Sequence, residues 1–178
     1  SYMKSLLELL KSLGVKDVGL LVEQGKGWVL AGEYLERSAA AAGVKVVGLE
    51  RYGGDELDFR PIITRLLKKK PEMLVLLSNP PYTQRLIAKI REISPKQRFT
   101  GYFEALQEPG LVEGMPFVAQ FEVADGFAVK FMNRFGNAPK SRAAQAYDIV
   151  NLLALSVEAT RNKPTPASIV DALRSRPE

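Results

Sequence analysis

Between Asp17 and Ser78, three short apolar segments alternate with two stretches in which apolar residues recur at helical spacing. The apolar segments, at 17–22, 44–50 and 73–77, have the length and composition of strands. A chain that runs strand, helix, strand, helix, strand predicts a parallel sheet with helices on both faces. In such a sheet all strands end at one edge, and ligands bind in the crevice there.

The same patterns predict the elements around these strands. Leucines give residues before Gly14 the apolar stripe of a helix, and a second helix at 28–42 is predicted to end at Gly43. Asp58 is expected to cap a third helix with Pro61 in its first turn, and a fourth helix covers 83–93. Further strands are predicted at 98–101 and 115–121. The predicted fold class is therefore α/β, a three-layer αβα arrangement with a mainly parallel sheet.

The chain changes character after residue 122, where only helices are predicted. Phe127, Phe131 and Phe135 line the first of these helices, and the others cover 141–160 and 165–174. We therefore divide the chain into an α/β ligand-binding lobe, 1–122, and a helical segment, 123–178. The helix at 141–160 is apolar around most of its circumference, which calls for burial from several sides. We expect it to pair with a second copy of the chain.

Composition removes several kinds of chemistry. The 178 residues carry a net charge of +5 and contain neither Cys nor His. The chain therefore lacks disulfides, thiolate nucleophiles, the commonest metal ligand and the commonest general base near neutral pH.

Lys68-Lys69-Lys70 ends a predicted helix, where cations complement the helix dipole. Without interleaved aromatic residues this run does not indicate nucleic-acid binding. The longest apolar run is shorter than the ~20 residues of a membrane span, and no signal peptide is visible.

Named catalytic motifs are also absent from the sequence. Gly25-Lys26-Gly27 fits neither the P-loop nor the dinucleotide fingerprint, and there is no Gly-x-Ser-x-Gly elbow. We predict that the chain is not an enzyme and uses no cofactor and no metal.

Polar residues follow the predicted strands and suit a site for a small polar molecule. Backbone N–H groups at the helix starts there attract anions. The candidates for ligand contact are Gln24, Trp28, Ser78, Asn79, Tyr102 and Glu104. Each has a plain structural alternative: Ser78 and Asn79 suit a turn before a helix, Trp28 suits the rim of the core, and Glu104 suits a solvated loop.

Several segments in order resemble the type I periplasmic binding proteins, nearest to the leucine/isoleucine/valine-binding receptors of ABC transporters. The resemblance covers nearly the whole chain. It rests on Gly14–Leu21, Ala42–Gly48, Asp58–Leu66 with Lys70-Pro71-Glu72, the step from Phe135 to Pro139, and Ala143–Asp148.

This resemblance implies one lobe of a two-lobed protein that closes on its ligand like a hinge. The chain would correspond to the second lobe and part of the return into the first. The implied function is the solute-binding component of an ABC-type uptake system for a branched-chain amino acid, amide or small organic acid. A membrane permease would be the partner, and the location would be the periplasm or another extracytoplasmic space.

The family's ligand contacts map onto this chain with small offsets. Trp28 is about one position from a frequent aromatic contact, and Ser78 and Asn79 occupy the loop that often supplies another. Glu104 is one residue from the acid that receives a ligand ammonium group in amino-acid binders. Two alternatives remain: a ligand-sensing regulatory domain of the same fold, and a flavodoxin-like domain that binds nucleotide or flavin.

Overall fold

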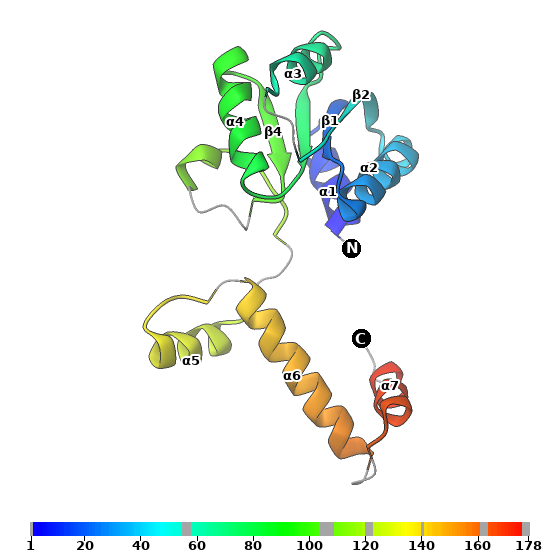
Figure 1. Ribbon diagram of the computed structural model, residues 1–178, viewed down its shortest axis with the longest axis vertical. Coiled ribbons are helices and arrows are strands. Elements are labelled where there is room, and N and C mark those ends of the chain that lie inside the picture. The colour runs from blue at the N-terminus through cyan, green and yellow to red at the C-terminus, as the bar shows by residue number, and fades with distance from the viewer. Residues whose placement is uncertain are drawn as a thin grey trace. The chain divides into compact units, whose positions relative to one another are not determined.

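A computed structural model describes residues 2–54, 58–103, 109–119, 123–139, 141–160 and 164–175 (Figure 1). The described elements follow in chain order: α1 (Tyr2–Ser12), β1 (Asp17–Glu23), α2 (Lys26–Ser38), the 3-10 turn η1 (Ala40–Ala42), β2 (Lys45–Tyr52), α3 (Arg60–Leu67), β3 (Met73–Leu77), α4 (Tyr82–Ile93), β4 (Arg98–Gly101), the 3-10 turn η2 (Pro109–Val112), α5 (Asp125–Phe135), α6 (Ser141–Ala159) and α7 (Pro166–Arg174). The chain divides into two compact units, Ser1–Ala119 and Gln120–Glu178.

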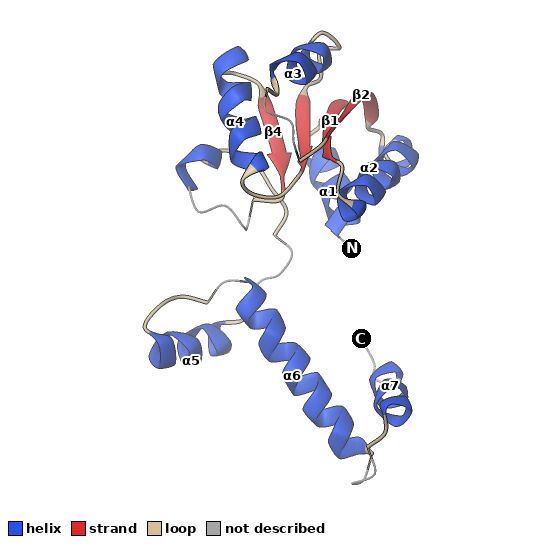
Figure 2. Ribbon diagram, in the orientation of Figure 1, coloured by secondary structure: helices blue, strands red, loops and turns tan. Residues whose placement is uncertain are grey.

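The first unit is built on a four-stranded sheet in the order β2-β1-β3-β4. All three strand pairings among the described residues are parallel, so the predicted parallel sheet is confirmed. Helices cover both faces of this sheet (Figure 2). The predicted α/β class and its three layers are confirmed as well.

Side chains of the two central strands alternate between two apolar clusters. On β3, Met73, Val75 and Leu77 belong to the cluster that includes α1 and α2, whereas Leu74 and Leu76 belong to the cluster that includes α3 and α4. All five residues of β3 are buried, as an unbroken apolar strand between two helical layers requires.

One close contact between α3 and the sheet depends on glycine. A Cβ atom on Gly19 would lie 2.8 Å from Cγ of Leu66, and one on Gly48 would lie 2.8 Å from Cδ1 of the same leucine. The buried side chain of Leu66 therefore packs over the backbone of β1 at Gly19 and of β2 at Gly48. Because Leu66 reaches the sheet only where side chains are missing, these two glycines set how near α3 lies.

Three predictions about individual elements need correction. Residues 115–119 form no strand; Pro116 lacks the N–H that a ladder needs, and 120–121 lie outside the described residues. The helix predicted at 28–42 begins at Lys26 and ends at Ser38, followed by the separate turn η1. The N-cap of α3 is Phe59 rather than Asp58, although the Asp58 carboxylate still accepts the N–H of Arg60 at 2.9 Å.

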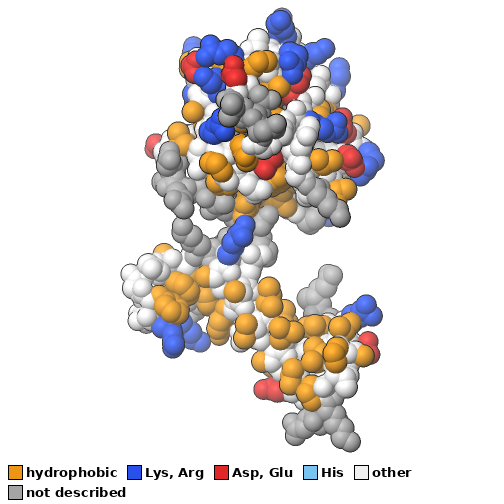
Figure 3. Space-filling view, viewed as in Figure 1, with side chains coloured by type: hydrophobic (Ala, Val, Ile, Leu, Met, Phe, Trp, Pro, Cys, Tyr) orange, Lys and Arg blue, Asp and Glu red, His pale blue; other side chains and the backbone are white. Residues whose placement is uncertain are grey.

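The second unit consists of helices in its described part. Phe127 on α5 and Tyr147 on α6 lie with their ring centroids 5.0 Å apart, and α6 also contacts α7. Thr165 and Ser168 form a reciprocal capping box at the start of α7. Much of α6 remains exposed, with Ile149 57% and Val150 64% accessible, and apolar side chains cover the helix in Figure 3. Within the described residues, no helix has the length and apolarity needed to cross a bilayer.

Candidate functional site

The carboxyl edge of the sheet is held together by hydrogen bonds between neighbouring strand ends. The Glu23 carboxylate, at the end of β1, accepts the backbone N–H of Asn79 at 2.9 Å. The backbone N–H of Gln24 donates to the carbonyl of Tyr52, at the end of β2, at 2.8 Å. Three neighbouring strand ends therefore have a defined geometry, as a binding site on loops requires.

A shallow pocket of about 360 Å³ opens at this edge between α2 and the connection after β3. Its lining residues are Gly25, Gly27, Trp28, Ala31 and Asn79. A Cβ atom on Gly27 would meet nothing within 4 Å, so a small molecule can approach the backbone there. Gly25 is the N-cap of α2 and offers no side-chain acceptor. The first N–H groups of this helix are therefore available to an anionic group such as a carboxylate.

Aromatic rings support the Trp28 side of the pocket. The indole of Trp28 lies 6.2 Å from the Tyr102 ring, centroid to centroid, and Tyr102 packs edge-on against Tyr2 at 6.1 Å. Tyr102 is only 5% exposed, whereas Trp28 is half-buried. Tyr102 thus lies behind Trp28 and restricts how the indole can move.

Ser78 lies at the same edge but its side chain is fully buried. Its hydroxyl is hydrogen-bonded to that of Thr83 at 2.8 Å. Nearby, burial raises the pKa of the Tyr52 phenol well above its ordinary value; the Glu23 charge adds to the rise and the Ser78 hydroxyl opposes it. The Tyr52 hydroxyl makes no hydrogen bond of good geometry with the described residues. These hydroxyls form a neutral, buried layer beneath the site.

The six predicted contact residues fall into three groups: accessible at the carboxyl edge, buried behind it, and outside the described residues. The accessible group is Gln24, Trp28 and Asn79, of which Trp28 and Asn79 line the pocket. Ser78 and Tyr102 are buried behind the edge, and Glu104 lies outside the described residues. The pocket residues Gly25, Gly27 and Ala31 were not among the predicted contacts, and the hydrogen bond between Glu23 and Asn79 was not predicted either.

Other features of the described residues do not compete with this site. A larger hollow of about 510 Å³ runs along β2 from Val44 to Leu49, and none of the predicted contact residues lines it. No group of three or more Asp, Glu, His or Cys residues in the described part of the chain could hold a metal ion.

A protein-family model described as periplasmic binding protein matches residues 1–177. None of the curated protein sequences matches the chain.

Solved structures of the same fold include three ABC-transporter receptors. A branched-chain amino acid ABC transporter periplasmic ligand-binding protein from Burkholderia xenovorans LB400 has a TM-score of 0.82 and 19% identity, over 98% of this chain and 50% of its own. An ABC transporter substrate-binding protein from Desulfitobacterium hafniense in complex with Leu has a TM-score of 0.76 and 18% identity, over 97% and 53%. An amino acid ABC transporter substrate-binding protein from Pseudomonas fluorescens Pf-5 has a TM-score of 0.75 and 16% identity, over 94% and 48%. The chain thus spans about half the length of these proteins.

Proposed function

Because the chain belongs to the periplasmic binding protein family, we propose that it is part of the solute-binding component of an ABC-type uptake system. The proposed ligand is a small polar solute such as a branched-chain amino acid, an amide or a small organic acid. Two of the structural relatives are named for amino acids, and a third was solved with Leu. The proposed activity is binding and delivery, without catalysis.

The observation that carries this proposal is the pocket at the carboxyl edge. It combines an indole, an exposed amide and two glycines that leave helix N–H groups accessible. An indole packs against an apolar side chain, while N–H groups and an amide bind a carboxylate or carbonyl. This pairing suits a solute with one apolar and one polar end, as leucine has.

The pocket forms one wall of a site, which bears on both affinity and mechanism. Ligand pockets normally enclose most of a ligand's surface, whereas this one is shallow. We propose that a second lobe covers the solute and that closure of the two lobes is the state recognised by a membrane permease. Such a component would act in an extracytoplasmic space.

A thermal-shift screen of the chain with amino acids, amides and small organic acids tests the proposed function. Stabilisation follows RT ln(1 + [L]/Kd), so a solute at ten times its Kd adds about 1.4 kcal/mol. Trp28→Ala should abolish the shift, and Tyr34→Ala, which removes an exposed aromatic of the same helix outside the pocket, should retain it. If a solute that stabilises the native chain stabilises both variants equally, the proposed site is wrong.

We also propose that α6 associates with a second copy of the chain. Val150, Leu153 and Val157 lie at helical spacing on α6 and are 64%, 43% and 39% exposed. Burying such side chains releases about 25 cal/mol for each Å² of apolar surface. Light scattering should show a dimer that Val150→Glu with Leu153→Glu converts to monomer. Asn151→Glu, which adds a charge at a polar position of the same helix, should leave it intact, and a monomeric native chain would refute the proposal.

A further inference from the structure

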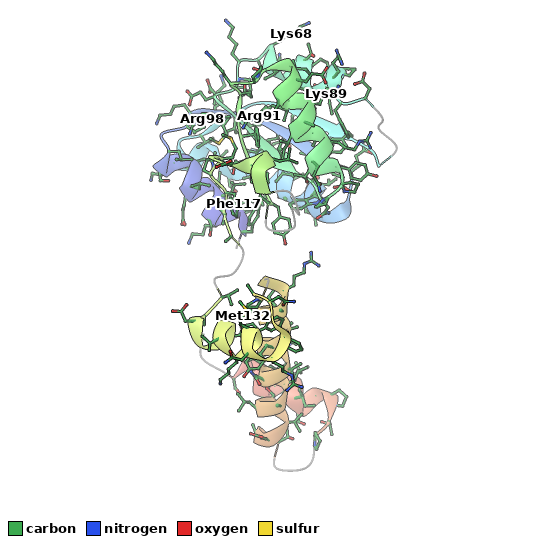
Figure 4. The ribbon with its side chains drawn as sticks, turned by 90° about the vertical axis from the view of Figure 1, so that its left-hand side faces the viewer. Lys68, Lys89, Arg91, Arg98, Phe117 and Met132 are labelled. Atoms are coloured by element: carbon green, nitrogen blue, oxygen red, sulfur yellow. The ribbon has the colours of Figure 1, made fainter. Side chains whose placement is uncertain are left out.

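Cationic side chains gather at the amino edge of the sheet, where the chain enters the strands. Four segments lead into the strands there, at 11–17, 43–45, 68–72 and 94–98. They include the end of α1 and the first residues of β1, β2 and β4, and are called the four connections below. Their cationic residues, here called the basic edge, are Lys11, Lys16, Lys45, Lys68, Lys69, Lys70, Lys96 and Arg98. All eight are exposed. Lys and Arg side chains gather at the top of the first unit in Figure 3, and Lys68 lies at the top of that unit in Figure 4.

Strand register brings these residues into one row. Lys45 on β2 pairs with Asp17 on β1, and Arg98 on β4 pairs with Met73 on β3. The N–H of Lys45 also donates to the carbonyl of Lys16 at 2.7 Å, which joins two of the connections. Neighbouring strands lie about 4.8 Å apart, and the Debye length at 0.1 M salt is about 10 Å. Charges on adjacent connections therefore act together.

This positive charge exceeds the negative charge of the same four connections, with eight cations against two carboxylates. Asp17 and Glu72 are the acidic residues of the four connections, and the Glu72 carboxylate already accepts the backbone N–H of Lys16 at 2.9 Å. None of the eight cations forms an ion pair with a described carboxylate. The dipole of α3 accounts for Lys68 and its two neighbours, because they follow the end of that helix. The dipole of α3 does not account for the cations in the connections that lead into β2 and β4.

We propose that the basic edge binds the surface of an anionic phospholipid membrane. Seven of its eight cations are lysines, which act as point charges toward phosphate, whereas arginine favours planar, bidentate recognition. The four connections contain no aromatic residue on which a base could stack, which disfavours single-stranded nucleic acid. Leu13, 37% exposed between Lys11 and Lys16, adds an apolar contact that a lipid surface accepts.

Binding through this edge would leave the proposed solute site free. The connections that enter parallel strands and those that leave them lie at opposite edges of the sheet. A membrane bound at the amino edge would therefore face away from the pocket that Trp28 and Asn79 line. This inference goes beyond the proposed function and does not depend on which solute is bound.

Sedimentation with sucrose-loaded vesicles tests the inference on the whole chain. Vesicles of phosphatidylcholine give the baseline, because exposed apolar residues on α6 can contact lipid without regard to charge. Vesicles that also contain phosphatidylglycerol should bind more chain at low salt, and this increment should vanish as the ionic strength rises. Lys68→Gln with Lys69→Gln and Lys70→Gln should lower the phosphatidylglycerol-dependent partition coefficient on the order of a hundredfold, since each lysine near such a surface contributes about one kcal/mol.

A control variant separates the position of the charge from its total. Lys4→Gln with Arg51→Gln and Lys130→Gln removes the same charge from exposed residues outside the basic edge and should reduce binding far less. The inference is overturned if phosphatidylglycerol adds no binding, or if the two triple variants lose binding equally. It is also overturned if duplex DNA binds at a salt concentration where these vesicles do not.

Discussion

The hydrogen bond between Glu23 and Asn79 gives a direct test of how the carboxyl edge is held. Glu23→Ala removes the acceptor of the Asn79 N–H, now 2.9 Å away, and Glu23→Gln keeps an acceptor oxygen but removes the charge. Hydrogen bonds to charged groups contribute about 1.5–3 kcal/mol. Glu23 is half-buried, so partial solvation of the freed N–H reduces this, and we expect Glu23→Ala to cost about 1–2 kcal/mol.

The assay is thermal unfolding, followed by circular dichroism at neutral pH. A cost of that size lowers the Tm of a chain of this length by roughly 3–6 °C, and Glu23→Gln should lie between Glu23→Ala and the unchanged chain. Glu8→Ala provides the control, because Glu8 is exposed on α1 and forms no ion pair with a described residue. If Glu23→Ala and Glu8→Ala unfold at the same temperature, Glu23 does not hold the edge together.

Three further substitutions test the packing and titration of the first unit. Gly101→Ala should destabilise by about 3 kcal/mol or more in urea unfolding, because its Cβ would lie 2.6 Å from the carbonyl oxygen of Leu76; a cost below one kcal/mol would contradict the described contact. Gly19→Ala should cost about 1–3 kcal/mol, and Leu66→Val in the same chain should recover part of that cost in a double-mutant cycle, whereas additive costs would refute the contact. Tyr52→Phe should be nearly neutral at pH 8, because the hydroxyl lacks a hydrogen bond of good geometry. Since the raised pKa keeps the phenol protonated in the folded state, the native chain should lose stability as pH rises past the ordinary tyrosine value of 10.0, and Tyr52→Phe should lose less; equal losses would show that Tyr52 does not titrate as described.

The secondary structure could be predicted where the pattern of apolar residues fitted only one kind of element. Five consecutive apolar residues in β3 indicated a strand buried on both faces, and this is how the strand lies. Gly14 and Gly43, predicted to end helical segments, have positive φ angles of 67° and 73°. The strand predicted at 115–121 rested on composition alone, without a turn or a partner pattern to support it, and it is absent from 115–119.

The side chains of the site were harder to predict because position at an edge does not give direction. Alternation along β3 nevertheless contains the information. Leu74 and Leu76 face the α3 and α4 cluster, so the next even position, Ser78, points to the same buried side, where Thr83 meets it. Asn79 continues the odd positions, which face α1 and α2, and it lines the pocket with Trp28. If the two-residue alternation of β3 is continued past Leu77, it predicts that Ser78 faces the buried side and Asn79 the opposite side.

Because the strands are parallel, the basic edge and the solute pocket lie at opposite edges of the sheet. The lipid-binding proposal and the solute-binding proposal can therefore be tested independently. Every strand of the described sheet runs the same way, so the lysines that precede the strands lie at one edge and the amides that follow lie at the other. Charges at the basic edge are therefore separated from the pocket by the length of a strand, about 15 Å or more, and salt screens them over that distance. The variant with Lys68, Lys69 and Lys70 changed to Gln should keep the full solute-induced thermal shift while it loses vesicle binding. Loss of both together would mean that the substitutions disturb β3 itself, which starts three residues after Lys70 and ends two residues before Asn79.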